Sequence, residues 1–319
     1  MAARDAWRWA VAAACVAVAG GAAADDGTDR DGDGAVVERA ELVIGPGRHA
    51  IGGIAIDNVL GDVRVEGYDG DSVQVVAVKH APDAAALARL RVTVVPDPSG
   101  EVRLSTSLAE RGGKAAVALA TVRIDLTVRV PRAATVTGRV ATGRLEVRDL
   151  DAGADLDSST GPIVVRNVAG SVFARSLDGS QRFEEVFGTL DSHAIDGDLS
   201  FDSVRGATLT AQAYAGDVSG RRVGSRQVRV SSIDGQIDLD AEAVAGGAVT
   251  VTSLRGAVAV RLHAPGGAAV RTRAGGRLVM PDGAGPSGRW VESQFGTVRS
   301  RAAVRVESRF GDVSFSLVQ

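Results

Sequence analysis

Residues 141–194 read ATGRLEVRDLDAGADLDS, STGPIVVRNVAGSVFARS and LDGSQRFEEVFGTLDSHA, three successive rows of equal length. Further rows begin at Ile195, Tyr214, Ile233, Leu254 and Ala274, and their length changes little from row to row. An internal repeat of this length indicates a structure built from stacked units. The third residue of every row is a glycine, which gives the series Gly143, Gly161, Gly179, Gly197, Gly216, Gly235, Gly256 and Gly276.

Apolar and polar residues alternate on both sides of these glycines. Two residues after the glycine, seven of the eight rows carry Leu, Ile or Val, and the exception is Gln181. A period of two predicts β-strands with one buried face, and glycine predicts tight turns between them. Two short strands cannot bury an apolar face alone, so successive rows must stack like on like. The sequence therefore predicts an all-β, single-stranded, β-helix-like β-solenoid with coils of roughly 18–21 residues; a two-sheet sandwich is the alternative.

The amino-acid composition is consistent with this fold and excludes several other classes of protein. The 319 residues are 45% apolar and 24% charged, which is enough apolar content to bury a core and excludes a wholly disordered chain. Gly 40 against Pro 9 is a high glycine content, and it fits repeated turns. The net charge of -3 argues against a nucleic-acid partner, since binding to phosphates needs clustered positive charge.

The N-terminal segment has the pattern of a signal peptide. Arg4 and Arg8 precede an apolar run from Trp9 to Gly21, and small alanines follow it. The run is shorter than the roughly 20 residues that cross a bilayer. We therefore expect residues 1–24 to be removed on export to the periplasm or cell surface, leaving a chain that does not span the membrane. A lipoprotein anchored at Cys15 is the alternative.

The rest of the chain divides by composition. Residues 25–35 are acidic and glycine-rich, which predicts a flexible linker. Residues 36–132 alternate without the repeat and predict an N-terminal β region that caps the solenoid. Residues 133–319 hold the repeats and a C-terminal cap, for which residues 290–319 are the candidate.

Catalytic motifs are missing from the sequence, so we expect no enzyme and no cofactor. There is no Gly-x-Ser-x-Gly elbow and no phosphate-loop lysine, and the histidines are scattered without metal-ligand spacing. The best metal candidates are Asp29, Asp31 and Asp33, which match the first half of a calcium loop. Ala40 stands where that loop needs its bidentate Glu, so a solvated acidic linker is the favoured interpretation.

Carboxylates beside the repeat turns form a second candidate site. Stacked coils bring such residues close together, because neighbouring strands lie about 4.8 Å apart. A column of this kind serves turn formation, binds calcium, or supplies the carboxylate pair of a glycoside hydrolase. Turn chemistry is the favoured interpretation, since Thr160, Ala215 and Arg255 interrupt the column. The residues concerned are Asp178, Asp196, Asp198, Asp217 and Asp234.

The chain resembles the bacterial putative-adhesin family of Gly-Asp-Ile/Val/Leu β-strand repeats, a domain of unknown function. The resemblance rests on the opening stretch of residues 56–70, the strand Asp125–Pro131, and repeats such as Ile195-Asp196-Gly197-Asp198-Leu199. It covers about residues 36–319 and implies an exported right-handed β-solenoid without established catalysis. Several rows depart from the Gly-Asp form, with Arg144, Pro162, Ser180, Gln236 or Ala257 after the glycine.

Together these patterns predict a non-enzymatic protein of the cell envelope that presents a repetitive β surface to a protein or glycan partner. The exposed aromatic candidates for such a surface are Phe173, Phe187, Tyr214 and Trp290. A periplasmic scaffold or an accessory protein of envelope-stress signalling is the alternative. A solenoid carbohydrate-active enzyme is a third hypothesis, and it would need a groove with paired carboxylates.

Overall fold

A computed structural model describes residues 36–47, 49–109, 121–296 and 301–318. The expected signal peptide, the acidic linker and the calcium candidates Asp29, Asp31 and Asp33 lie outside the described residues. The N-terminal strands are β1 (Val36–Ile44), β2 (Gly53–Leu60), β3 (Val63–Tyr68), β4 (Val73–Ala81), β5 (Leu90–Pro96), β6 (Glu101–Leu108), β7 (Arg123–Pro131), β8 (Thr135–Thr142) and β9 (Leu145–Leu150), with the helical turn α1 (Ala84–Leu87) between β4 and β5.

The described chain is all-β apart from α1, which confirms the predicted class. Asp83 caps α1, because its carboxylate accepts the N–H of Ala86 at 2.7 Å. The remaining strands are β10 (Gly153–Thr160), β11 (Ile163–Asp178), β12 (Gln181–Asp196), β13 (Leu199–Ala215), β14 (Val218–Asp234), β15 (Ile237–Glu242), β16 (Ala248–Ser253), β17 (Val258–His263), β18 (Ala268–Ala274), β19 (Leu278–Met280), β20 (Gly283–Gly285), β21 (Val291–Phe295), β22 (Ala302–Ser308) and β23 (Val313–Val318).

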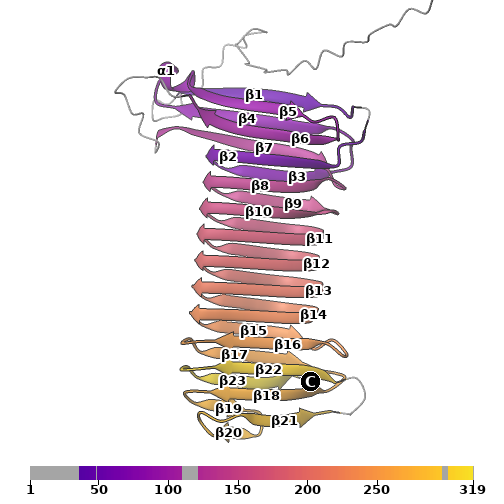
Figure 1. The fold of residues 1–319 in the computed structure, drawn as a ribbon, viewed down its shortest axis with the longest axis vertical. Helices are drawn as coiled ribbons and strands as arrows, with labels where there is room; N and C mark the ends of the chain where they lie inside the picture. The colour runs from indigo at the N-terminus through magenta and orange to yellow at the C-terminus, as the bar shows by residue number, and fades with distance from the viewer. Residues whose placement is uncertain (1–35, 48, 110–120, 297–300, 319) are drawn as a thin grey trace, which may run out of the picture.

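The central strands stack in parallel and in register along the long axis of the molecule (Figure 1). Ile163 on β11 pairs with Gln181 on β12, one sequence row later in the chain. Leu199 on β13 pairs with Val218 on β14, again one row later. Each such level consists of two strand segments joined by a glycine turn, and we call this unit a coil.

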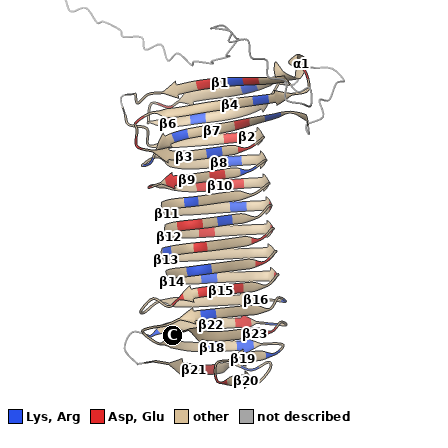
Figure 2. Ribbon diagram, turned by 180° about the vertical axis from the view of Figure 1, so that it is seen from behind, with Lys and Arg blue, Asp and Glu red and all other residues tan. Residues whose placement is uncertain are grey.

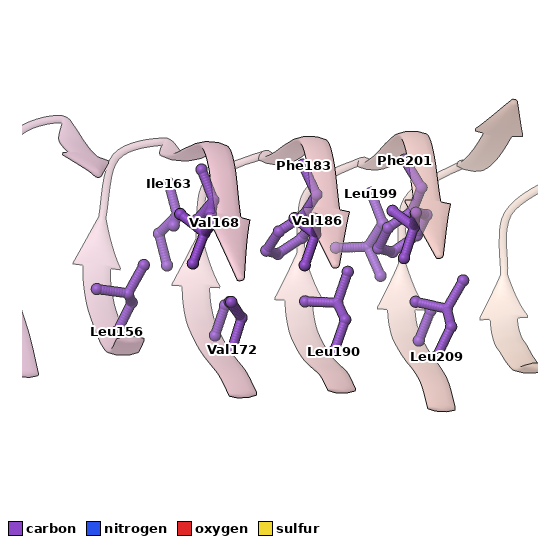
Figure 3. Packing of buried hydrophobic residues seen from close by; sticks show 14 of the residues in the cluster. Leu156, Ile163, Val168, Val172, Phe183, Val186, Leu190, Leu199, Phe201 and Leu209 are labelled. Carbon is purple, nitrogen blue, oxygen red and sulfur yellow. The ribbon is translucent and has the colours of Figure 1, made fainter. Parts of the chain in front are cut away.

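The core lies between the two strand segments of every coil. Val172, Leu190 and Leu209 form one inward column, and Leu156 lies in the next inward column of the same strands. Ile163 and Leu199 belong to a column on the facing strand segments (Figure 3). Phe183 and Phe201 stack with their ring centroids 5.3 Å apart and their planes 6° from parallel. This column geometry follows from the pairing, because parallel strands place equivalent side chains directly above one another.

The N-terminal region is continuous with the stack. β2 and β3 form a coil that pairs on one side with β8 and β9, and on the other side with β6 and β7. Beyond this level the pairing becomes antiparallel, since β4 lies against β7 and β1 against β4. At the N-terminal end, the spatial order of the strands in the sheet therefore differs from their order in the sequence.

The C-terminal end corrects one expectation. The sequence predicts a cap at residues 290–319, and β21 of this segment does cover the end, but β22 and β23 form a complete coil inside the stack. β22 pairs in parallel with β16 and β18, and β23 with β17 and β19 (Figure 1). β22 and β23 carry the same apolar alternation as the other coils, so their inward side chains continue the core columns on both sides. The end itself is covered by the short antiparallel strands β20 and β21.

Within the described part of the chain, no helix has the length and apolar character needed to cross a membrane.

Candidate functional site

A groove of about 720 Å³ runs across the successive coils built from β8 and β10–β14. It lies on the outer face of the segments whose inward residues include Leu156, Val172 and Leu190. Its walls come from equivalent positions in each coil, because the parallel register repeats one outward side chain at every level. The groove is thus a direct product of the sequence repeat.

One wall of the groove is a column of polar side chains that we call the polar ladder. Consecutive rungs are register partners on neighbouring strands, and in the first four rungs negative and positive residues alternate. Alternation of this kind neutralises charge along the column, since each cation has an anion on an adjacent level. The rungs are Asp57, Arg139, Asp157, Arg175, His193 and Gln212.

Ion pairs hold the charges of the polar ladder. Arg175 Nε donates to Asp157 Oδ1 at 2.8 Å, and its Nη2 donates to Asp155 Oδ1 at 3.4 Å. The hydrogen bond to Asp157, together with the charge of that carboxylate, raises the pKa of Arg175 above its ordinary value. His193 Nε2 lies 2.9 Å from Asp191 Oδ1. Arg139, Asp157 and Arg175 therefore already have partners of opposite sign within the protein.

Beside the polar ladder runs a column of exposed apolar residues, the apolar ladder, made of Leu177, Ile195 and Tyr214. Their side chains are 56%, 54% and 58% exposed and line the groove on three consecutive coils. Single exposed apolar residues are common, but a contiguous set within a groove is typical of interaction sites. Each of these residues lies two positions before a row glycine. Their side chains point outward because the residue before each of them points inward.

The expected exposed aromatics are distributed over more than one place. Tyr214 is in the groove, while Phe173 and Phe187 are 44% and 47% exposed on neighbouring coils. Trp290 instead lies under arginines of two strands, with the Arg271 and Arg305 guanidinium carbons 4.7 Å and 4.6 Å from its ring centroid. Leu177 and Ile195 were not singled out from the sequence, although period-two alternation marks both as outward positions.

The row glycines lie directly above one another at the turns. A Cβ on Gly179, whose φ is +151°, would come within 2.2 Å of the Gly161 carbonyl oxygen. A Cβ on Gly256 would lie 1.7 Å from the Gly235 oxygen. The chain needs glycine here because the backbones of neighbouring coils approach too closely for any side chain.

The turn carboxylates act on the backbone of the next coil. Asp198 Oδ1 accepts the N–H of Asp217 at 2.8 Å, and Asp217 Oδ1 accepts the N–H of Gln236 at 2.7 Å. Asp62 does the same for Arg144 at 2.9 Å. This repeated hydrogen bond gives a structural reason for an Asp after the glycine.

The remaining turn carboxylates lie in the same region. Asp178 and Asp196 are register partners on β11 and β12, and Asp234 Oδ2 is 3.3 Å from Arg255 Nη2. Asp196 is also in register with Ala215, and Ala215 with Asp234, so the column changes residue type from coil to coil. The arrangement fits the turn interpretation.

The histidines stay apart, as their spacing indicated. His80, His193 and His263 each lie beside one aspartate, Asp125, Asp191 and Asp240 respectively, at 3.2, 2.9 and 3.1 Å. His49 is exposed in a bend. Among the described residues, no group of three or more His, Cys, Asp or Glu side chains is arranged to hold a metal ion.

The opposite face of the stack carries a second set of ion pairs, and bands of both charges are visible on successive strands in Figure 2. Arg166 Nε donates to Glu184 Oε2 at 2.8 Å, and its Nη1 donates to Glu146 at 3.2 Å. Glu184 also accepts from Arg182. Burial opposes ionisation of Glu184, but the hydrogen bonds from Arg182 and Arg166 outweigh it and lower its pKa.

Comparison with known proteins gives limited information. No family model and no curated protein matches the chain. A solved "putative adhesin" from Bacteroides fragilis NCTC 9343 aligns at 13% identity and a TM-score of 0.38, over 88% of this chain and 96% of its own. A "putative adhesin" from Parabacteroides merdae ATCC 43184 aligns at 10% and 0.29, over 89% and 96% of the two chains.

A "putative cell adhesion protein" from Clostridium sporogenes ATCC 15579 aligns at 8% identity and a TM-score of 0.26, over 88% of this chain and 100% of its own. Values this low do not establish a shared function. The function therefore has to be inferred from the residues of this chain.

Proposed function

We propose that this protein is an exported, adhesin-like β-solenoid of the cell envelope that binds a protein or glycan partner through its groove. The parallel registers, each offset by one sequence row, support the solenoid interpretation. The signal-peptide pattern of residues 1–24 supports export. A stack of coils joined by tight turns gives such a binding surface a rigid support.

The observation that carries the binding proposal is the apolar ladder. Leu177, Ile195 and Tyr214 stay more than half exposed at equivalent positions of three neighbouring coils, where they line one groove. Exposed apolar surface rimmed by polar groups is a common feature of interaction sites. Because Arg139, Asp157 and Arg175 of the polar ladder are already paired with one another, the partner is expected to offer an apolar or uncharged surface rather than a dense charge.

We further propose that the protein is not an enzyme. The carboxylates of Asp62, Asp198 and Asp217, which a hydrolase would need free in a groove, accept hydrogen bonds from backbone amides at the turns. The charged residues of the groove itself, such as Arg175 and Asp157, are bonded to each other. These contacts are those of structural groups.

Binding is tested with purified protein and envelopes isolated from host cells that lack the gene. The variant Leu177→Ser/Ile195→Ser/Tyr214→Ser should lose most of the co-sedimentation seen with the natural sequence. The control Val43→Ser changes a residue that is 65% exposed outside the groove and should bind normally. Equal retention of all three proteins on the envelopes would remove the groove from the proposal.

Location is tested separately by protease treatment of intact cells that carry a C-terminally tagged protein, with a periplasmic protein as control. Loss of the tag from intact cells supports an adhesin on the surface. Loss only after the envelope is opened contradicts surface adhesion. The periplasmic scaffold or envelope-stress accessory would then be the better hypothesis, with the same groove facing a periplasmic partner.

A further inference from the structure

The coil formed by β22 and β23, here called the inserted coil, lies out of chain order between two coils that precede it in the sequence. Val304 on β22 pairs with Val249 on β16 and with Val270 on β18. Val313 on β23 pairs with Val258 on β17 and with Leu278 on β19. The inserted coil thus separates two coils that are adjacent along the chain.

The buried apolar residues of the two flanking coils would pair with each other as well as they pair with those of the inserted coil. Removing the inserted coil from the register would bring Val249 opposite Val270 and Val258 opposite Leu278. These four side chains are all buried, so apolar residues would still meet apolar residues. Each of these pairs is separated along the chain by one sequence row, which is the offset that the central coils use.

We infer that the protein has a second packing in which β18 and β19 pair directly with β16 and β17, and that the inserted coil enters between them afterwards. We call this second packing the sequential state. Contacts between neighbouring rows form early, because they close shorter loops than the pairing of β22 with β16. The inserted coil is also synthesised after both coils that flank it.

Burial explains why insertion wins in the finished protein. Val304, Val306, Val313 and Phe315 are at most 3% exposed in the stack. In the sequential state they have no coil to pack between, so much of this apolar surface returns to water. Insertion also replaces one parallel strand pairing by two in each half of the coil. β22 pairs with both β16 and β18, and β23 pairs with both β17 and β19.

Trp290 holds the inserted coil against its neighbour. Its ring lies under Arg305 of β22 and under Arg271 of β18, so one aromatic side chain bridges the two levels. Phe295 on the end strand β21 also stacks on Phe315, with ring centroids 6.2 Å apart. The contacts of Trp290 with Arg305 and of Phe295 with Phe315 exist only in the inserted packing and resist its reversal.

Two engineered disulfides distinguish the states in the full-length chain, with Cys15→Ser as background. Ala259 pairs with Ser314, and Ser314 pairs with Val279, all at positions that are not buried. Ala259→Cys/Ser314→Cys should therefore cross-link the inserted packing. Ala259 and Val279 stand two levels apart, about 9.6 Å at the usual strand spacing, which is too far for a disulfide. Ala259→Cys/Val279→Cys should cross-link only the sequential state.

Each variant is unfolded in urea and refolded, with oxidant present either from the first moment or only after refolding is complete. We expect the 259–279 disulfide in the first case and not in the second. We expect the 259–314 disulfide in the second case. Absence of the 259–279 disulfide throughout refolding would overturn the proposal. Its formation in the finished protein would overturn the strand order on which the proposal rests.

A variant of the bridging residue gives an independent readout. Adding Trp290→Ala to the 259–279 pair should allow that cross-link to form slowly in the refolded protein, where the pair with Trp290 intact gives none, because the inserted coil is held less firmly. The control Phe310→Ala removes an aromatic that is 66% exposed at the turn of the inserted coil and should not change it. An equal cross-link in both variants would contradict the role of Trp290.

Discussion

At the scale of single residues, Gln181 is the most informative departure from the repeat. It occupies a column position between Ile163 and Leu199 and is fully buried. Its Nε2 donates to Ser176 Oγ and to the His193 carbonyl, both at 2.8 Å, while Ser192 Oγ donates to its Oε1 at 2.8 Å. The sequence showed the polar residue, but only the structure shows that its polar atoms are satisfied.

Gln181→Leu is expected to destabilise the protein although leucine suits the column. The change leaves the buried Ser192 hydroxyl without its acceptor, which costs about 1–3 kcal/mol. Urea unfolding measures the loss. The double variant Gln181→Leu/Ser192→Ala removes that hydroxyl and should recover most of the stability. A double variant as unstable as the single one would mean that the hydrogen-bond network is not the cause.

A second residue-scale feature is a series of left-handed backbone positions at the corners of five consecutive coils, from β9 to β14. Asp149, Asn167, Glu185, Ser203 and Arg222 all have φ between 49° and 60°. Residues other than glycine adopt this conformation at a cost, and Asn and Asp tolerate it best. A buried residue follows each one, such as Val168 and Val186, so the corner turns the chain toward the next inward position.

At the scale of strands, charged side chains on neighbouring levels form ladders, and Glu184 is the member whose pKa is clearly shifted. Glu184 has a pKa below its ordinary value of 4.5, because its hydrogen bonds from Arg182 and Arg166 outweigh the effect of burial. A lowered folded pKa means that the stabilisation is complete above the ordinary value. It is lost as the pH falls through the lowered pKa.

Glu184→Gln should therefore reduce stability near neutral pH more than at acidic pH. The gap between the two unfolding curves should close as the pH falls below 4.5, the ordinary value for this group. Urea midpoints measured over a pH series give the comparison. Glu292→Gln is the control, since its carboxylate is 74% exposed beside Arg271, and it should give a small, nearly constant difference. A pH-independent effect of Glu184→Gln would contradict the ion-pair assignment.

At the scale of the whole molecule, the stack behaves as a series of equivalent levels. β11, β12 and β13 pair residue for residue, interrupted by one register shift after Gly188. Stability in such a structure is approximately the sum of nearest-neighbour contacts. Coils are therefore expected to be removable as units, provided that the register of the remaining ones is kept.

Deletion of residues 177–194, one complete row, should give a folded all-β protein that is shorter by about 4.8 Å. Ser176 would then be followed by Ile195, which is equivalent to its natural neighbour Leu177 in the next row. Ile163 on β11 would pair directly with Leu199 on β13. Circular dichroism and small-angle scattering measure the fold and the length. Deletion of residues 174–190, which is one residue short of a row, is the control and should fail to fold, because a shift by one residue inside a strand turns inward side chains outward. A misfolded full-row deletion would contradict independent coils.

Local chemistry by itself determined much of this protein. Alternation with a period of two and glycine at fixed spacing determine the all-β class, the inward Val, Leu and Ile columns, and the turns, because each depends on a few neighbouring residues. Outward positions such as Leu177 and Ile195 follow from the same alternation. The groove could therefore be anticipated in its parts, although not as a continuous surface.

Only the tertiary structure decided the order of the levels at the two ends. The chain offers many strand edges with nearly the same pattern, so Val304 fits against Val249 as well as Val270 does. A choice between such partners depends on the total burial of the stack and on contacts from distant residues, such as Trp290 with Arg305. Pairing between distant strands is not encoded in any single row, which is why the sequence pattern predicts a terminal cap for β22 and β23 instead of a level inside the stack.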